Sequence, residues 1–235
     1  IYTVAGGMHA SLLPEDFQFP FVDAIVIGEG ERSFPALINA ISNGQKGKPI
    51  PGVAWNLNSK FEISTPQRPF AYSEAKIPNR GLTKHLRDKY FFLIARPCAA
   101  IETSRGCPYN CNFCIMKQEK ETYRVMLAKE TLFKAIKDAA KYGAKLVHFS
   151  GGGEPLTHPN IEEAILLCRK LGLKVAISTN GYLLDKKNLK NIIKANHIRI
   201  SLNAGSPEIY QKIHNMKKED FYKVIENIKN LVRFR

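Results

Sequence analysis

The sequence predicts an α/β fold in which a parallel sheet forms part of a β/α barrel, preceded by the end of another α/β unit. From Leu127 onward, short apolar segments alternate with stretches whose apolar residues recur at helical spacing, the pattern of successive β-α-β units. The first 45 or so residues show the same alternation on a smaller scale, with glycines after each apolar segment. Only four β/α units fit before the chain ends.

The barrel segment contains four short apolar runs that we expect to be strands buried on both faces. They are residues 99–103, 146–150, 175–179 and 198–202. Amphipathic stretches follow the first three runs, and Gly143 and Gly172 are placed to end the first two helices. Asn160, Asp185 and Ser206 are suitable residues to begin helices.

The amino-terminal segment predicts strands near 2–5 and 24–27 and a helix near 32–43. Residues rich in Pro, Gly and Asn follow, with an expected hairpin that pairs 53–56 with 61–64. We therefore divide the chain into an α/β segment (1–45), a connecting segment with the hairpin (46–97) and the barrel segment (98–235).

The chain ends and its charge set further expectations. It begins at Ile1 with a strand that runs into a glycine turn, and a helical pattern continues to Arg235, so we expect a fragment of a longer protein. The formal charge of +14 comes from dispersed lysines, which argues against a nucleic-acid partner. With no long apolar run and no signal peptide, we expect no membrane span and a cytoplasmic location.

Three of the five cysteines form a C-x3-C-x2-C run at Cys107, Cys111 and Cys114, in the loop after the first barrel strand. Thiolates are the ligands that iron-sulfur clusters select. Three cysteines would leave the fourth iron of a 4Fe-4S cluster open, whereas a structural zinc site needs four ligands and no second pair occurs. Cys168 lies on the apolar stripe of its helix and is expected in the core, and we interpret Cys98 as structural as well.

Polar side chains and glycines follow the other barrel strands. The second run ends in Ser-Gly-Gly-Gly-Glu-Pro (150–155), the third in Ser-Thr-Asn-Gly (178–181) and the fourth in Ser-Leu-Asn-Ala-Gly (201–205). Such strand ends form the usual active-site face of β/α barrels, where they can converge on one ligand. Each of them could also simply cap a turn.

Taken together, the run from Ser104 to Cys114 (SRGCPYNCNFC) resembles the cluster loop of the radical S-adenosylmethionine (SAM) superfamily. The resemblance implies a partial, TIM-like β/α barrel and a 4Fe-4S cluster held by Cys107, Cys111 and Cys114. It also implies that the open iron chelates the amino and carboxylate groups of SAM. One electron would then split SAM into methionine and a 5'-deoxyadenosyl radical.

The same resemblance implies further SAM contacts. Phe113 matches the position beside the adenine. Gly152, Gly153 and Glu154 match the motif that binds the SAM amino group, so these four residues are predicted cofactor contacts.

The later strand ends match the rest of that pattern. Ser178 and Thr179 correspond to positions near the SAM ribose, and Ser201 and Asn203 to positions that touch its carboxylate or ribose. Many relatives have Asp where this chain has Asn203. The resemblance assigns no catalytic side chain, because the cofactors carry the chemistry.

In the amino-terminal segment, residues 6–11 and 26–34 resemble the closing strands of a Rossmann-like cobalamin-binding domain. That domain is attached to one class of radical SAM proteins, which includes methyltransferases and the anaerobic magnesium-protoporphyrin monomethyl ester cyclase. The cobalt-facing DxHxxG loop of the family would lie upstream of Ile1. Cobalamin is therefore expected as a cofactor of the full-length protein rather than of this segment.

These features predict a radical SAM enzyme that methylates or cyclises a small molecule or peptide, with an external electron donor such as flavodoxin or ferredoxin. One alternative is an RNA-modifying methylthiotransferase, which the basic charge suits but which normally carries a second cysteine cluster, and none precedes Cys98. Another is a non-catalytic iron-sulfur or electron-transfer module, which needs a fourth protein ligand.

Overall fold

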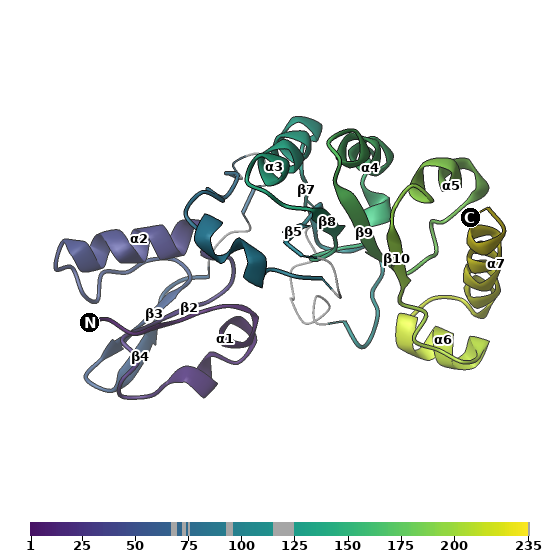
Figure 1. The fold of residues 1–235 in the computed structure, drawn as a ribbon. Coiled ribbons are helices and arrows are strands. Elements are labelled where there is room, and N and C mark those ends of the chain that lie inside the picture. Colours follow the sequence, from purple (N-terminus) through teal and green to yellow (C-terminus); the bar gives the residue numbers. More distant parts are fainter. Residues whose placement is uncertain (67–69, 72–73, 75, 93–95, 115–124, 235) are drawn as a thin grey trace. The chain divides into compact units, whose positions relative to one another are not determined.

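The computed structural model of the chain describes residues 1–66, 70, 71, 74, 76–92, 96–114 and 125–234. The chain divides into two compact units, residues 1–71 and 72–235. Figure 1 labels their helices and strands in chain order.

The first unit contains a four-stranded mixed sheet. Its elements are β1 (Val4–Ala5), α1 (Met8–Leu12), η1 (Pro14–Phe17), β2 (Ala24–Val26), α2 (Gly30–Ser42), β3 (Val53–Leu57) and β4 (Lys60–Ile63). The strand order is β1-β2-β3-β4, with β1 parallel to β2 and the other two pairs antiparallel. The two strands and the helix expected before residue 45 are present as β1, β2 and α2.

The hairpin of β3 and β4 belongs to this first sheet. Its two turn residues, Asn58 and Ser59, have φ angles of 55° and 66°, as a type I′ turn requires. Strand β3 also pairs with β2, with Trp55 opposite Ala24. The expected connecting segment, 46–97, therefore includes a hairpin that is part of the first unit, and that unit continues to Ala71.

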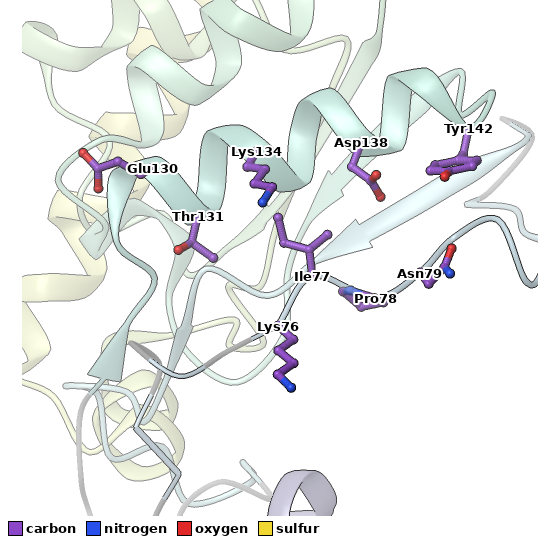
Figure 2. A pocket seen from close by; sticks show the side chains of 9 residues that line it. All are labelled: Lys76, Ile77, Pro78, Asn79, Glu130, Thr131, Lys134, Asp138 and Tyr142. Atoms are coloured by element: carbon purple, nitrogen blue, oxygen red, sulfur yellow. The ribbon is translucent and has the colours of Figure 1, made fainter.

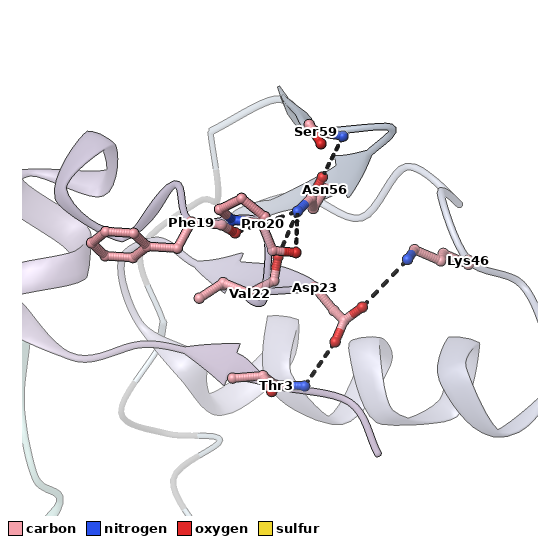
Figure 3. A network of polar contacts seen from close by, with 8 residues as sticks. All are labelled: Thr3, Phe19, Pro20, Val22, Asp23, Lys46, Asn56 and Ser59. Carbon is pink, nitrogen blue, oxygen red and sulfur yellow. Dashed lines mark hydrogen bonds and ion pairs between the residues drawn. The ribbon is translucent and has the colours of Figure 1, made fainter.

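A polar network holds β3 against the loop that leads into β2 (Figure 3). The buried amide of Asn56 donates hydrogen bonds to three backbone carbonyls between Phe19 and Val22, the shortest of them 2.8 Å from the carbonyl oxygen of Val22. In the same network the Asp23 carboxylate lies 3.4 Å from Lys46 Nζ. The Asn56 amide thus supplies the donor that the carbonyl oxygen of buried Val22 needs.

The second unit is built around a parallel sheet with the order β10-β9-β8-β5. Its elements are η3 (Lys84–Lys89), β5 (Cys98–Ile101), β6 (Ser104–Arg105), β7 (Val125–Met126), α3 (Lys129–Lys141), β8 (Leu146–Phe149), η5 (Pro155–Thr157), α4 (Ile161–Lys170), β9 (Lys174–Thr179), α5 (Lys186–Ile192), β10 (His197–Ile200), α6 (Pro207–His214) and α7 (Lys218–Phe234). The four predicted barrel strands correspond to β5, β8, β9 and β10, which confirms the α/β class and the parallel sheet.

Helices α3, α4 and α5 lie in a row beside this sheet (Figure 1). Their apolar stripes and the strands share one core, which includes the completely buried side chains of Phe149, Ile165 and Ile177. Gly143 and Gly172 follow α3 and α4 with φ angles of 83° and 74°, so they can end these helices where other residues would be strained.

The helical stretch after Ser206 consists of two helices. The Ser206 hydroxyl accepts a hydrogen bond from the Ile209 N–H and caps α6, with Pro207 in the first turn. Asn215 adopts the left-handed conformation, with φ 53°, and ends α6 before α7 begins at Lys218. The backbone thus turns immediately after His214, a feature that matters for the cysteine loop.

Candidate functional site

The four parallel strands bring their carboxyl ends to the same edge of the sheet. Ile101 of β5 is in register with Phe149 of β8, which is in register with Ile177 of β9. The residues that follow these strands therefore emerge side by side. The cysteine loop comes after β5, the glycine run after β8, and the Ser-Thr-Asn-Gly and Ser-Leu-Asn-Ala-Gly segments complete β9 and follow β10.

The glycine run after β8 packs directly on the start of the cysteine loop. A Cβ atom on Gly152 would lie 2.5 Å from Glu102 Oε1, and one on Gly153 would lie 2.5 Å from Ser104 Oγ and 2.8 Å from the carbonyl oxygen of Gly106. Glu102 Oε1 also accepts a hydrogen bond from the Gly152 N–H at 2.8 Å. Only glycine permits this approach, so the two segments form one continuous surface.

Glu154 is buried and joins the ends of β8 and β9. Its Oε1 accepts hydrogen bonds from the Thr179 hydroxyl at 2.6 Å and from the Leu156 N–H at 3.1 Å, and its Oε2 accepts one from the Asn180 N–H at 2.7 Å. Burial raises the pKa of this carboxyl, while these hydrogen bonds oppose the rise. A carboxylate has about four acceptor positions, so three hydrogen bonds leave one for a ligand.

The three loop cysteines lie in one electrostatic environment. Backbone N–H groups of Tyr109 and Glu154 hydrogen-bond to Cys107, which connects the loop to the glycine run. Burial, followed by the neighbouring Cys107 and Cys114, raises the pKa of the Cys111 thiol to about 11. Burial also raises the pKa of Cys107. The three thiols therefore interact electrostatically with one another, and burial favours the neutral form of Cys107 and Cys111.

The residue types of the cysteine loop are the donors that iron-sulfur clusters select. Within the described ranges, no group of three or more His, Cys, Asp or Glu side chains is close enough to hold a single metal ion. In a 4Fe-4S cluster each thiolate binds a different iron, so its ligands stand further apart than those of one ion. The three cysteines lie in one loop, interact electrostatically and supply the soft thiolate donors that such a cluster requires.

Cys168 is outside this region. Its side chain is completely buried in the main core, and burial raises its thiol pKa to about 12. Cys98 is also buried, at the start of β5. Both positions agree with the interpretation of these two residues as structural.

The remaining predicted contact residues lie at the ends of β9 and β10. The Ser178 hydroxyl is 2.9 Å from His148 Nε2. The Ser201 N–H donates to the Thr179 carbonyl oxygen at 2.8 Å, which ties the two strand ends together. Asn203 is exposed and adopts the left-handed conformation, with a φ of 51°, in the segment after β10. These residues border the same edge as the glycine run.

The sequence did not indicate the role of two residues that shape this site. Glu102, at the end of β5, fixes the glycine run through the hydrogen bond to Gly152. His214, at the end of α6, is 1% exposed and places Nδ1 3.4 Å from Cys111 Sγ. The ring of Phe113, the predicted adenine contact, meets the His214 ring edge to face at 5.2 Å. Phe113 itself is 54% exposed, so its other surface is accessible to a ligand.

A cavity of about 620 Å³ lies elsewhere in the second unit, along α3 (Figure 2). Glu130, Lys134 and Asp138 face it from successive turns of that helix, Tyr142 faces it from just beyond the helix end, and the segment 76–79 lies opposite. None of the predicted site residues lines this cavity, so we separate it from the cysteine loop and the strand ends.

The cysteine loop and the strand ends beside it lie in a segment that matches a known protein family. The family model of the radical SAM superfamily matches residues 101–234, more than half of the chain, and the chain belongs to that superfamily. This is a family of radical SAM enzymes, which use a 4Fe-4S cluster and SAM.

Among curated proteins, the chain is 37% identical over 116 residues to an uncharacterized methyltransferase of Pyrococcus horikoshii, covering 48% of this chain and 25% of that protein. It is 29% identical over 216 residues to the anaerobic magnesium-protoporphyrin IX monomethyl ester cyclase of Rubrivivax gelatinosus, covering 86% of this chain and 38% of the cyclase. The chain thus spans less than half the length of either relative. The resemblance to methyltransferases and cyclases that the sequence predicted is confirmed.

Solved structures show the same fold. The cobalamin-dependent SAM radical enzyme OxsB matches with a TM-score of 0.70 at 17% identity, over 97% of this chain and 35% of OxsB. The radical SAM methyltransferase TsrM from Kitasatospora setae matches with a TM-score of 0.66 at 18% identity, over 97% of this chain and 47% of TsrM. Both matches extend over the first unit as well as the second. In the part of the chain that the structure describes, no helix is long and apolar enough to cross a membrane.

Proposed function

We propose that this chain binds a 4Fe-4S cluster through Cys107, Cys111 and Cys114 and SAM at the adjoining strand ends. The observation that carries the proposal is the packing of Gly152 and Gly153 on the start of the cysteine loop, which joins the cluster loop to the second strand end in one surface. When bound, the reduced cluster supplies the electron that splits SAM into methionine and a 5'-deoxyadenosyl radical.

The chain's own residues bind and orient the cofactors in this proposal. The free acceptor position of Glu154 and the glycine backbone suit the SAM amino group, and the exposed surface of Phe113 suits its adenine. The polar groups of Ser178, Thr179, Ser201 and Asn203 border the same edge and would bind the ribose and carboxylate. An external donor such as flavodoxin or ferredoxin would deliver the electron.

We further propose that the longer protein methylates or cyclises an organic substrate, either a small molecule or a peptide, and that the first unit is the closing part of a cobalamin-binding domain. The methyltransferase and cyclase relatives, together with the fold similarity of the first unit to cobalamin-dependent enzymes, support this proposal. The substrate pocket and the cobalt-facing loop would then lie on parts of the protein outside this chain.

The test is anaerobic reconstitution with iron and sulfide, followed by reduction and electron paramagnetic resonance spectroscopy with and without SAM. We expect a 4Fe-4S signal that shifts when SAM is added and that is absent from Cys111→Ala. Cys168→Ala is the matched control and should keep the signal, since that thiol lies in the core. A signal that is indifferent to SAM, or stoichiometric zinc without a cluster, would refute the proposal.

A further inference from the structure

The end of α6 contacts three successive residues of the cysteine loop. The Asn112 N–H donates to the carbonyl oxygen of Ile213 at 2.8 Å, and its side-chain amide donates to the carbonyl oxygen of Lys212 at 2.5 Å. On either side of Asn112, Cys111 and Phe113 both contact His214. The loop is therefore fixed, residue by residue, to a helix that lies about 100 positions later in the sequence.

This helix end is a rigid support. The last carbonyl groups of a helix have no partner within it, and Asn112 satisfies two of them. The left-handed residue Asn215 ends the helix at this point, and its other end is capped by Ser206. Since both ends of α6 are defined, the groups that meet the loop have fixed positions.

His214 is held by contacts on several sides. Its ring stacks on Tyr210, with the ring centroids 4.3 Å apart, and only 1% of the residue is exposed. Nε2 lies 2.8 Å from the carbonyl oxygen of Leu202, in the segment after β10. A carbonyl only accepts hydrogen bonds, so Nε2 carries the hydrogen, and Nδ1 of the neutral ring is an acceptor for the Cys111 thiol.

We infer that His214 is a positioning residue that sets the place of Cys111 in the cluster loop before the metal arrives. The inference rests on the proposed function, because Cys111 matters here only as a cluster ligand. Groups that orient a metal ligand typically change metal affinity about 10- to 100-fold when they are removed. His214 touches no reacting atom and acts entirely through Cys111 and the loop that carries it.

Two substitutions separate its two contacts. The amide of Gln reaches about as far as Nε2, so His214→Gln keeps a donor for Leu202 and loses the group beside Cys111. The amide of Asn lies near the place of Nδ1, so His214→Asn keeps a polar group beside Cys111. The control is His197→Asn, a half-buried histidine at the start of β10, the opposite end of that strand from the site.

Four quantities are measured for each protein: the thermal midpoint of the metal-free form, the alkylation rate of Cys111 in that form, the iron bound on anaerobic reconstitution, and the paramagnetic signal with and without SAM. We expect His214→Gln to keep its thermal midpoint, to alkylate faster at Cys111 and to lose about 10- to 100-fold in iron affinity. His214→Asn should recover most of the iron and the signal, and the control should match wild type.

The outcomes separate the two claims. If wild type binds the cluster and responds to SAM while His214→Gln matches it in alkylation, iron and signal, the inference is wrong and the proposed function stands. Equal losses in both His214 variants, together with lowered thermal midpoints, would make His214 a purely structural residue and also overturn the inference. A wild type that binds no cluster would overturn the proposed function and, with it, this inference.

Discussion

Replacing Gly153 with alanine should disrupt the contact between the glycine run and the cysteine loop. The new Cβ would lie 2.5 Å from Ser104 Oγ and 2.8 Å from the carbonyl oxygen of Gly106, and real Cβ atoms essentially never approach other atoms below 3.0 Å. The Ser104 side chain is buried, and the Gly106 carbonyl is backbone, so neither can rotate out of the way. One segment has to move as a whole.

Inserting a methyl group into a well-packed region costs about 1–3 kcal/mol. For a chain of this size, each kcal/mol lowers the thermal midpoint by about 2–4 °C. Gly153→Ala should therefore melt several degrees below wild type and, because the cysteine loop is displaced, bind less iron on reconstitution. Circular dichroism melting and iron analysis measure the two effects.

Gly205→Ala is the matched control. This glycine also follows a barrel strand, but a Cβ there would meet no atom within 4 Å, and its φ is not in the left-handed region. Its thermal midpoint should stay within about 1 °C of wild type, because surface substitutions of this kind change stability by at most about 0.5 kcal/mol. If Gly153→Ala were as stable as Gly205→Ala and took up full iron, the reasoning from the close approach would be refuted.

Three further predictions concern the same region. Thr179→Val removes the hydroxyl that donates to Glu154 at 2.6 Å and should lower the free energy of unfolding in urea by about 1–3 kcal/mol. Thr179→Ser should be about as stable as wild type, and equal stabilities of the Val and Ser variants would contradict the prediction. The pKa of Glu154 is raised above its usual 4.5, so the carboxyl's contribution to stability is complete below that pH and is lost as pH rises through the folded pKa. In Glu154→Gln, the free energy of unfolding should fall less steeply as pH rises above 4.5 than it does in wild type. An unchanged slope in this variant would contradict the prediction. In the metal-free native protein, iodoacetamide at pH 8 should modify half-buried Cys114 faster than Cys111 and Cys168, whose thiol pKa values are about 11 and 12. Mass spectrometry measures the order of modification, and slower modification of Cys114 would contradict this prediction.

The elements of the second unit were predictable because their signals are local. Apolar runs of four or five residues and helical periodicity predicted β5, β8, β9 and β10, and glycines marked the ends of α3 and α4. The left-handed Asn215 had a local signal too, since asparagine tolerates that conformation, but the amphipathic pattern around it concealed the break.

Long-range contacts were not predictable in this way. Nothing in the local sequence around Glu102 or His214 indicates that one would hold Gly152 and the other would reach Cys111. The hairpin of β3 and β4 was expected, but its pairing with β2 depends on strands about 30 positions apart, so the sequence placed it in a connecting segment. Periodicity reports which face of an element is buried and not what covers that face.

Strand β10 has a consequence for handling the protein. Within the described residues it pairs with β9 alone, so the N–H and C=O groups along its other side are available to another strand. Such an edge is a template for intermolecular strand addition, which exposed charged residues such as Arg199 weaken but do not abolish. We therefore expect this chain, when it is produced by itself, to self-associate as its concentration rises. Comparing light scattering across a dilution series would identify the concentrations at which the measurements above report on a monomer.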